Sequence, residues 1–265
     1  MAVAFSGLFL SPASQASSTV FAGFDLFQTG GGTTFMGVPF VGVPLGSFDF
    51  GGSIGIKPTG LTDTIVHRFG SSIGPGLTAP VPIELAGLQL VSAVPFSFGL
   101  EPADFHYITL QKNRSLLEGG PGPFSTGFIT VTVGPEAPAH GTFDSFFDVY
   151  FDLRHGGLTG AIDTSGMLTM SSSGSTWSHT APPGSVLIPD ANYLLNGTST
   201  SNDFMPFSVM ESHPSGAMHN VQPAQLMAIP FGFAPGLGLA LCSALFGVSQ
   251  LRCKLASRGK RLQWA

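Results

Sequence analysis

Apolar and polar side chains alternate most regularly between residues 143 and 154. The odd positions carry the apolar residues Phe143, Phe147, Val149, Phe151 and Leu153, and the even positions carry Asp144, Phe146, Asp148, Tyr150, Asp152 and Arg154. Only Ser145 and Phe146 interrupt this alternation. Because successive side chains of a strand point to opposite faces, the pattern predicts a strand with one buried and one solvated face.

Shorter apolar segments occur along most of the chain, separated by glycine and proline. We predict further strands at residues 62–69, 82–98, 107–111 and 128–133. Many Gly and Pro together with many Phe, Val, Ile and Thr favour short strands joined by tight turns. Short strands with one apolar face pack stably as two facing sheets. The expected fold for residues 17–212 is therefore all-β, a two-sheet antiparallel β-sandwich of jelly-roll type.

The pattern changes towards the C-terminus. Asn, Ser, His and Pro are frequent from residue 190 to 227, which predicts irregular structure, and residues 213–234 are interpreted as a linker. The apolar residues 235–251 follow, and these 17 residues would form about 25 Å of helix, near the short end of what crosses a bilayer. We predict one C-terminal transmembrane helix, with a soluble amphipathic helix as the alternative. The basic residues 252–265 are expected in the cytoplasm.

The N-terminus has the character of a secretory signal. Residues 2–10 are apolar and are followed by small residues, so we predict a signal peptide over residues 1–16, cleaved after Ala16. No Lys or Arg precedes Lys57, so the signal lacks its basic region. The alternatives are a start site placed too late and an apolar first strand.

The charge of the chain is divided unevenly along its length. Fifteen acidic and five basic side chains precede residue 228, and five basic ones follow Leu251, so the body carries −10 and the tail +5. An acidic body argues against nucleic acid as a partner. Both cysteines, Cys242 and Cys253, lie in the C-terminal segment, so the body has no disulfide, thiolate metal site or cysteine nucleophile.

Residues 229–261 resemble the sorting signals of bacterial proteins that exosortases process. Such signals combine a short proline-containing motif, a transmembrane helix and a basic cluster. The matching residues are Pro230, Phe231, Phe233, Pro235, Arg252, Lys254 and Arg258. The motif is similar to the cyanobacterial Pro-Phe-Glu-Phe-Ser-Pro variant of the PEP-CTERM type, with Gly232 in place of Glu and Ala234 in place of Ser. The resemblance implies export, an exosortase-type processing enzyme as partner, and transfer to the cell surface or the extracellular polymer matrix.

Three carboxylates on one strand face raise the possibility of a calcium site. Asp144, Asp148 and Asp152 are four residues apart, which corresponds to roughly 13 Å between neighbours on a strand. Calcium ligands lie within about 2.6 Å of the ion, so the three cannot hold one ion together. One of them with loop oxygens could do so, and a solvated acidic face is the alternative; no other cofactor is expected.

Other chemical motifs are weaker. The segment 51–55 matches the nucleophile elbow of hydrolases at Ser53, but Pro58 and Gly60 exclude the helix that an elbow needs, so a glycine-rich hairpin is favoured. His213 and His219, with Glu211, could meet a metal on a loop, and solvated histidines are the alternative.

The expected function follows from the terminal segments rather than from an active site. We expect an exported, surface-anchored, non-catalytic protein of the extracellular matrix. The first alternative is a carbohydrate-binding module or adhesin that contacts glycans, including exopolysaccharide, through Tyr150 and Trp177. The second is a secreted hydrolase centred on Ser53.

Overall fold

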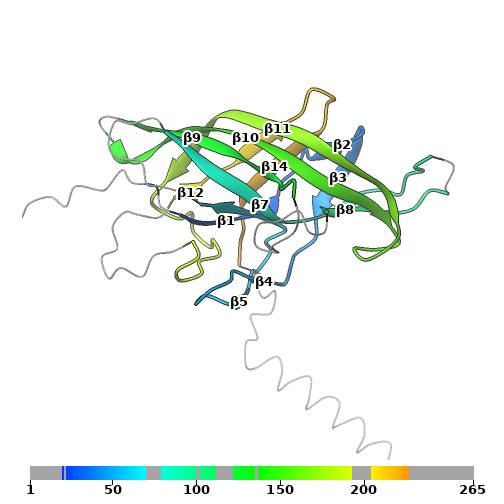
Figure 1. Ribbon diagram of the computed structural model, residues 1–265, viewed down its shortest axis with the longest axis horizontal. Helices are drawn as coiled ribbons and strands as arrows, with labels where there is room; N and C mark the ends of the chain where they lie inside the picture. Colours follow the sequence, from blue (N-terminus) through cyan, green and yellow to red (C-terminus); the bar gives the residue numbers. More distant parts are fainter. Residues whose placement is uncertain are drawn as a thin grey trace, which may run out of the picture. The chain divides into compact units, whose positions relative to one another are not determined.

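The computed structural model describes residues 20, 22–69, 79–99, 102–111, 122–134, 137–192 and 204–226. The strands within these residues are β1 (Gly23–Thr29), β2 (Thr34–Phe35), β3 (Val38–Gly42), β4 (Ser47–Asp49), β5 (Ile56–Pro58), β6 (Thr64–Arg68), β7 (Ala79–Ser92), β8 (His106–Leu110), β9 (Thr126–Gly134), β10 (Ala137–His155), β11 (Ile162–Ser178), β12 (Met205–Pro206), β13 (Val209–Ser212) and β14 (Met218–Pro223) (Figure 1). The predicted strands correspond to β6, β7, β8, β9 and β10, and the all-β class is confirmed.

Eight antiparallel strands close into a barrel. The pairs run in the order β1, β6, β7, β9, β10, β11, β13 and β14, and β14 pairs again with β1. The closing pair joins Phe27 to Pro223 and Thr29 to Val221. The predicted two-sheet sandwich is therefore wrong. An apolar face can be buried against a second sheet or by curling the sheet on itself, and the alternation of side chains is the same in both cases.

The barrel wall stays closed beyond the ends of its shorter strands. The first part of β7 pairs with β6 and β9, whereas residues 89–92 at its end pair with β3 and β8. β10 likewise pairs with β9 over its first half and with β8 near His155. β2 pairs with both β3 and β14. The strands β2, β3 and β8 thus continue the wall where β1, β6 and β9 end.

Phenylalanine fills much of the barrel interior. Every apolar odd-numbered residue predicted to face inwards on β10 is buried, with at most 7% of its surface exposed. Phe35 meets Phe151 edge to face at 5.2 Å between ring centroids, and Trp177 stacks on Phe204 at 5.3 Å. An eight-stranded barrel is just wide enough for side chains to fill, and large rings fill it with few residues.

A second apolar cluster covers the outside of β1 and β6. Phe24 and Leu26 of β1 and Ile65 of β6 pack there against Phe50 and Val186. The β4–β5 hairpin supplies Phe50, and Phe24 meets this ring edge to face at 4.9 Å. Both faces of β1 and β6 are therefore buried, which explains why their sequences do not alternate as clearly as β10.

The barrel extends further along the chain than predicted. Strands β13 and β14 occupy residues 209–223, where irregular structure and the start of a linker were expected. Residues 213–226 therefore belong to the barrel domain. In the part of the chain that the structure describes, no helix is long and apolar enough to span a membrane. The signal peptide at 1–16, the helix at 235–251 and the tail at 252–265 lie outside the described residues.

Candidate functional site

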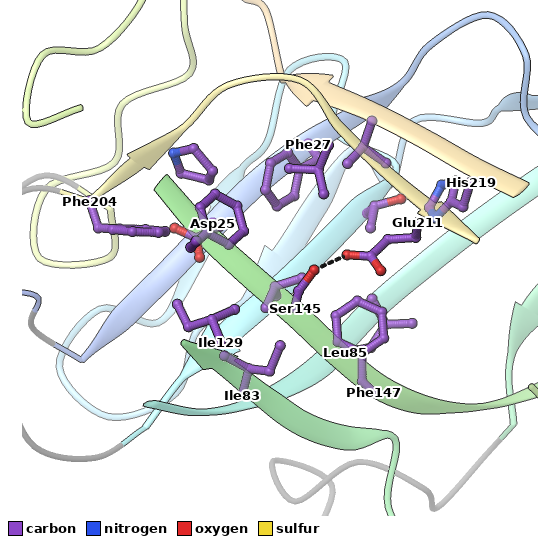
Figure 2. Close-up of a pocket in the computed structure, with 16 residues that line it drawn as sticks. Asp25, Phe27, Ile83, Leu85, Ile129, Ser145, Phe147, Phe204, Glu211 and His219 are labelled. Atoms are coloured by element: carbon purple, nitrogen blue, oxygen red, sulfur yellow. Dashed lines mark hydrogen bonds between the residues drawn. The ribbon is translucent and has the colours of Figure 1, made fainter. Parts of the chain in front are cut away.

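Two small cavities lie inside the barrel. The first has a volume of about 40 Å³ and the second about 60 Å³, so each has room for several water molecules. Leu85, Phe147 and His219 line both cavities and so form the layer between them. The first cavity, shown in Figure 2, is lined by Asp25, Phe27, Thr64, Val66, Ile83, Leu85, Ile129, Phe143, Ser145, Phe147, Phe204, Pro206, Val209, Glu211, His219 and Val221.

Glu211 places a carboxyl group in this mostly apolar interior. On β13, Val209 and Glu211 are buried while Met210 and Ser212 are exposed, so the period of the strand turns Glu211 inwards. Ser145 Oγ donates a 2.5 Å hydrogen bond to Glu211 Oε1. Glu211 Oε2 is buried without a hydrogen-bond partner. Burial disfavours the charged form and raises the pKa of Glu211 to about 7, although the bond from Ser145 acts in the opposite direction.

A serine chain leads from Glu211 towards the surface. Ser145 Oγ lies 2.8 Å from Ser172 Oγ, which lies 3.0 Å from Ser175 Oγ. Ser145 is buried, and the two β11 serines are half-buried. The chain coincides with the register shift of the β10–β11 pair between Phe143 and Ser145. Hydroxyls both donate and accept, so this row forms a continuous hydrogen-bonded path from Glu211 to the partly exposed Ser175.

His219 adds a second polar group beside Glu211, its direct partner across the β13–β14 pair. Its Nε2 lies 3.3 Å from Thr29 Oγ1, and that hydroxyl donates a 2.8 Å hydrogen bond to Asp63 Oδ1. Nε2 must therefore be the donor to Thr29, which leaves Nδ1 as an acceptor. Burial lowers the pKa of His219 to about 4, so the ring is neutral near neutral pH.

Asp25 supplies the other carboxyl group of the first cavity. Its Oδ2 accepts a 2.9 Å hydrogen bond from Arg68 Nε, while Oδ1 is buried without a partner. The Arg68 guanidinium lies 4.9 Å from the centre of the Phe204 ring. Burial raises the pKa of Asp25, and this effect outweighs the neighbouring Arg68 charge. Figure 2 shows Asp25 near Phe204 and Glu211 near His219.

The three candidate calcium ligands have separate hydrogen-bond partners on the outer face of β10. Asp144 is exposed and accepts bonds from Ser173 and the Gly174 amide, which lower its pKa. Asp148 accepts a 2.7 Å bond from Thr169. Asp152 is buried and bonds to Arg154 and to Ser165. The structure does not bring the three together, and among the described residues no three acidic, histidine or cysteine side chains are arranged to hold a metal ion.

The residues considered for glycan contact lie in different environments. Trp177 has no exposed surface, and its ring packs against Phe204 and His179 in the core. Tyr150 is half-buried on β10, and its backbone amide bonds to Ser125 Oγ at 2.9 Å. The two rings therefore do not form a shared exposed platform.

The structure places the residues of the remaining predicted motifs in different parts of the fold. Ser53 lies in the loop of the β4–β5 hairpin, where Gly51, Gly52 and Gly55 have positive φ, so the hairpin interpretation of this segment is confirmed. His213 lies in a turn and bonds to Ser215, whereas His219 lines the interior. The sorting-signal residues lie outside the described part of the chain.

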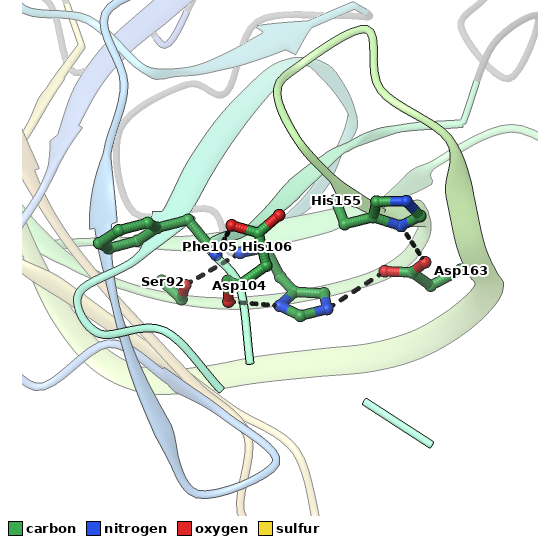
Figure 3. A network of polar contacts seen from close by, with 6 residues as sticks. All are labelled: Ser92, Asp104, Phe105, His106, His155 and Asp163. Carbon is green, nitrogen blue, oxygen red and sulfur yellow. Dashed lines mark hydrogen bonds and ion pairs between the residues drawn. The ribbon is translucent and has the colours of Figure 1, made fainter. Parts of the chain in front are cut away.

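A polar network joins the ends of three strands away from the cavities (Figure 3). Asp163, at the start of β11, contacts His155 Nδ1 of β10 through Oδ1, and its Oδ2 lies 3.3 Å from His106 Nε2 of β8. His106 Nδ1 lies 3.0 Å from the Asp104 carbonyl oxygen, and the His106 amide bonds to Ser92 Oγ. The network fixes the β10–β11 turn to β8.

Sequence reasoning found the inward face of β10 but not the role of Ser145 and Glu211. The signal at Ser145 was a polar residue at an inward position of an otherwise apolar face. Glu211 gives a weaker signal, because in the sequence it stands out only as a possible metal partner of His213 and His219. Comparison with family models, with curated protein sequences and with solved structures finds no match to the chain.

Proposed function

We propose that the chain is an exported, non-catalytic binding protein that is held at the cell surface and whose barrel interior binds a small, mostly apolar molecule. The observation that carries the binding function is the buried Glu211 Oε2, which has no partner and borders an apolar cavity. A buried polar atom without a hydrogen bond is costly, so a ligand that pairs with it gains affinity.

The closed barrel and its small apolar cavities favour the binding of one small ligand. Small closed barrels can enclose a single small molecule between their side chains. Leu85, Phe147 and His219 line both cavities, so a small molecule in either cavity would contact these three side chains. Most of the lining is aliphatic or aromatic, which favours an apolar body.

Cavity filling tests the binding function. The purified full chain is titrated with n-propanol and n-butanol by ligand-observed NMR. Val209→Phe fills the first cavity, and Met210→Phe makes the same kind of change at the exposed neighbour. We expect Val209→Phe to abolish binding and Met210→Phe to leave it unchanged. Binding to a folded Val209→Phe protein with unchanged affinity would refute the proposal; if that variant does not fold, Val221→Ile, which enlarges another side chain of the first cavity, replaces it.

The location is proposed from the sequence. The terminal segments, the acidic body and the resemblance of residues 229–261 to exosortase-processed signals support export and a place at the cell surface or in the extracellular polymer matrix. Fractionation of cells that express a tagged chain tests this, with mass spectrometry of the mature C-terminus. Recovery from the cytosol alone would contradict it.

A further inference from the structure

The polar atoms that lack partners on the lining of the first cavity are of one kind. Glu211 Oε2 and Asp25 Oδ1 are both carboxyl oxygens, and both are buried. We propose that the ligand of the barrel is a short primary alkylamine, bound with its ammonium group at Glu211 and its alkyl chain against Leu85 and Phe147. This inference rests on the proposed binding function and names the class of ligand.

The hydrogen-bond donors around Glu211 already have acceptors, so the ligand must supply the donor. Ser145 donates its hydroxyl hydrogen to Glu211 Oε1, and the His219 Nε2 hydrogen is directed to Thr29. Thr29 in turn donates to Asp63. When Glu211 and Asp25 are ionised, what remains around the cavity accepts hydrogen bonds, so a ligand group that donates them is favoured over one that only accepts.

Charge selects an ammonium group among the possible donors. When the carboxyl of Glu211 is protonated, a neutral amine that enters takes that proton, because the amine is the stronger base; the nitrogen gains one N–H bond and the carboxyl loses its O–H bond. The product is an ammonium–carboxylate pair with a charge-assisted hydrogen bond, which is about twice as strong as a neutral one. A carboxylate ligand would instead bring a like charge between Asp25 and Glu211, two buried carboxyl groups.

The apolar lining determines the rest of the ligand. Leu85 and Phe147 line the first cavity together with Glu211, so an alkyl chain that starts at Glu211 packs against them. Each buried methylene should tighten binding roughly three- to fourfold until the space is filled. Cavities of about 40 and 60 Å³ limit the chain to a few carbons without movement of the wall.

Three four-carbon probes separate the possibilities. Calorimetry at pH 8 compares n-butylamine, n-butanol and n-butyrate on the purified full chain and on its Glu211→Gln variant, with Asp148→Asn on the outer face as the control. We expect butylamine to bind at least tenfold more tightly than butanol and butyrate not to bind. Glu211→Gln should lose at least tenfold for butylamine and less than threefold for butanol, and Asp148→Asn should match the natural chain.

The outcomes distinguish this inference from the proposed function. Equal affinity for butanol and butylamine, or an unchanged butylamine affinity in Glu211→Gln, would overturn the amine assignment and leave the binding function standing. No binding of any probe would overturn both. If Glu211→Gln does not fold, the natural chain is titrated at pH 8 and pH 5: protonation of Glu211 should weaken butylamine binding at least fivefold and leave butanol unchanged, and an unchanged butylamine affinity would contradict the inference.

Discussion

Ser145 and Glu211 are joined by a 2.5 Å hydrogen bond inside the barrel, although β11 lies between their strands β10 and β13 in the wall. Both side chains are at least 94% buried. The bond therefore links two strands that share no backbone pairing, and it holds the Glu211 carboxyl at the edge of the first cavity.

Replacing Ser145 by alanine should destabilise the barrel. The change leaves Glu211 Oε1 without its donor, and loss of such a buried bond costs about 1–3 kcal/mol. The pKa of Glu211 should rise further, because the bond from Ser145 lowers it. Urea unfolding measures the first effect. Ser173→Ala is the control, since Ser173 is exposed and bonds to Asp144, and it should change stability by less than about 0.5 kcal/mol.

Glu211 and His219 should make opposite contributions to the pH dependence of stability. The pKa of Glu211 is raised from 4.5 to about 7, so its contribution is present below pH 4.5 and is lost as the pH rises to 7. The pKa of His219 is lowered from 6.5 to about 4, so its contribution is present above pH 6.5 and is lost as the pH falls to 4. The two effects largely cancel in the natural chain.

Variants should expose each contribution separately. Glu211→Gln should make the free energy of unfolding rise from pH 4.5 to pH 6.5 more steeply than in the natural chain, by on the order of 3 kcal/mol. His219→Gln should shift the slope in the opposite direction. Burial also raises the pKa of Asp25 and Asp63, but these groups are common to all three proteins. Parallel stability curves for the natural chain and Glu211→Gln would exclude a perturbed Glu211.

Removing the side chain of Leu85 should join the two cavities. Leu85→Ala deletes part of the layer between them and should cost about 2–5 kcal/mol. Benzene should bind in the enlarged apolar space and recover part of this loss, in proportion to its concentration over its dissociation constant. Thermal unfolding with and without benzene measures the recovery. Leu187→Ala, at a position with 43% of its surface exposed, should show none.

The effect of the buried Asp25–Arg68 pair on stability should depend on the presence of both side chains. Arg68→Met leaves the Asp25 carboxyl buried without its cation, which should cost about 3–5 kcal/mol. The double change Asp25→Leu with Arg68→Met should recover most of that loss, because no unpaired charge remains. A double-mutant cycle in urea measures the coupling, and additive losses would show that the two side chains act independently.

The sequence predicted individual strands and their buried faces, but not how the strands pair into a closed sheet. The alternation of Phe143, Phe147, Val149, Phe151 and Leu153 identified the inner face of β10 correctly. It could not distinguish a barrel from a sandwich, because closure depends on the pairing of β1 with β14, whose residues are nearly 200 positions apart. Alternation describes one strand and its two faces, whereas closure is a property of the whole sheet.

The candidate site was difficult to predict because its polar residues occupy inward positions of the strands. Glu211 and His219 point into the barrel, so β13 and β14 lack the apolar alternation of a strand and resemble a polar loop in sequence. Ser145 marked the site on β10 by interrupting the apolar face, but its partner lies 66 residues away. Polar residues at inward positions of a strand are therefore the signal to follow in a chain of this kind.

Intermolecular NOEs with bound n-butylamine test the central claim, that the barrel interior beside Glu211 is a binding site. The methyl groups of Leu85, Val209 and Val221 line the first cavity, whereas Phe128 and Phe146 are exposed on the outside of the wall. The account predicts NOEs from the alkyl protons of butylamine to those methyl groups, and their loss in Val209→Phe. NOEs to the outer rings of Phe128 and Phe146 alone would contradict it.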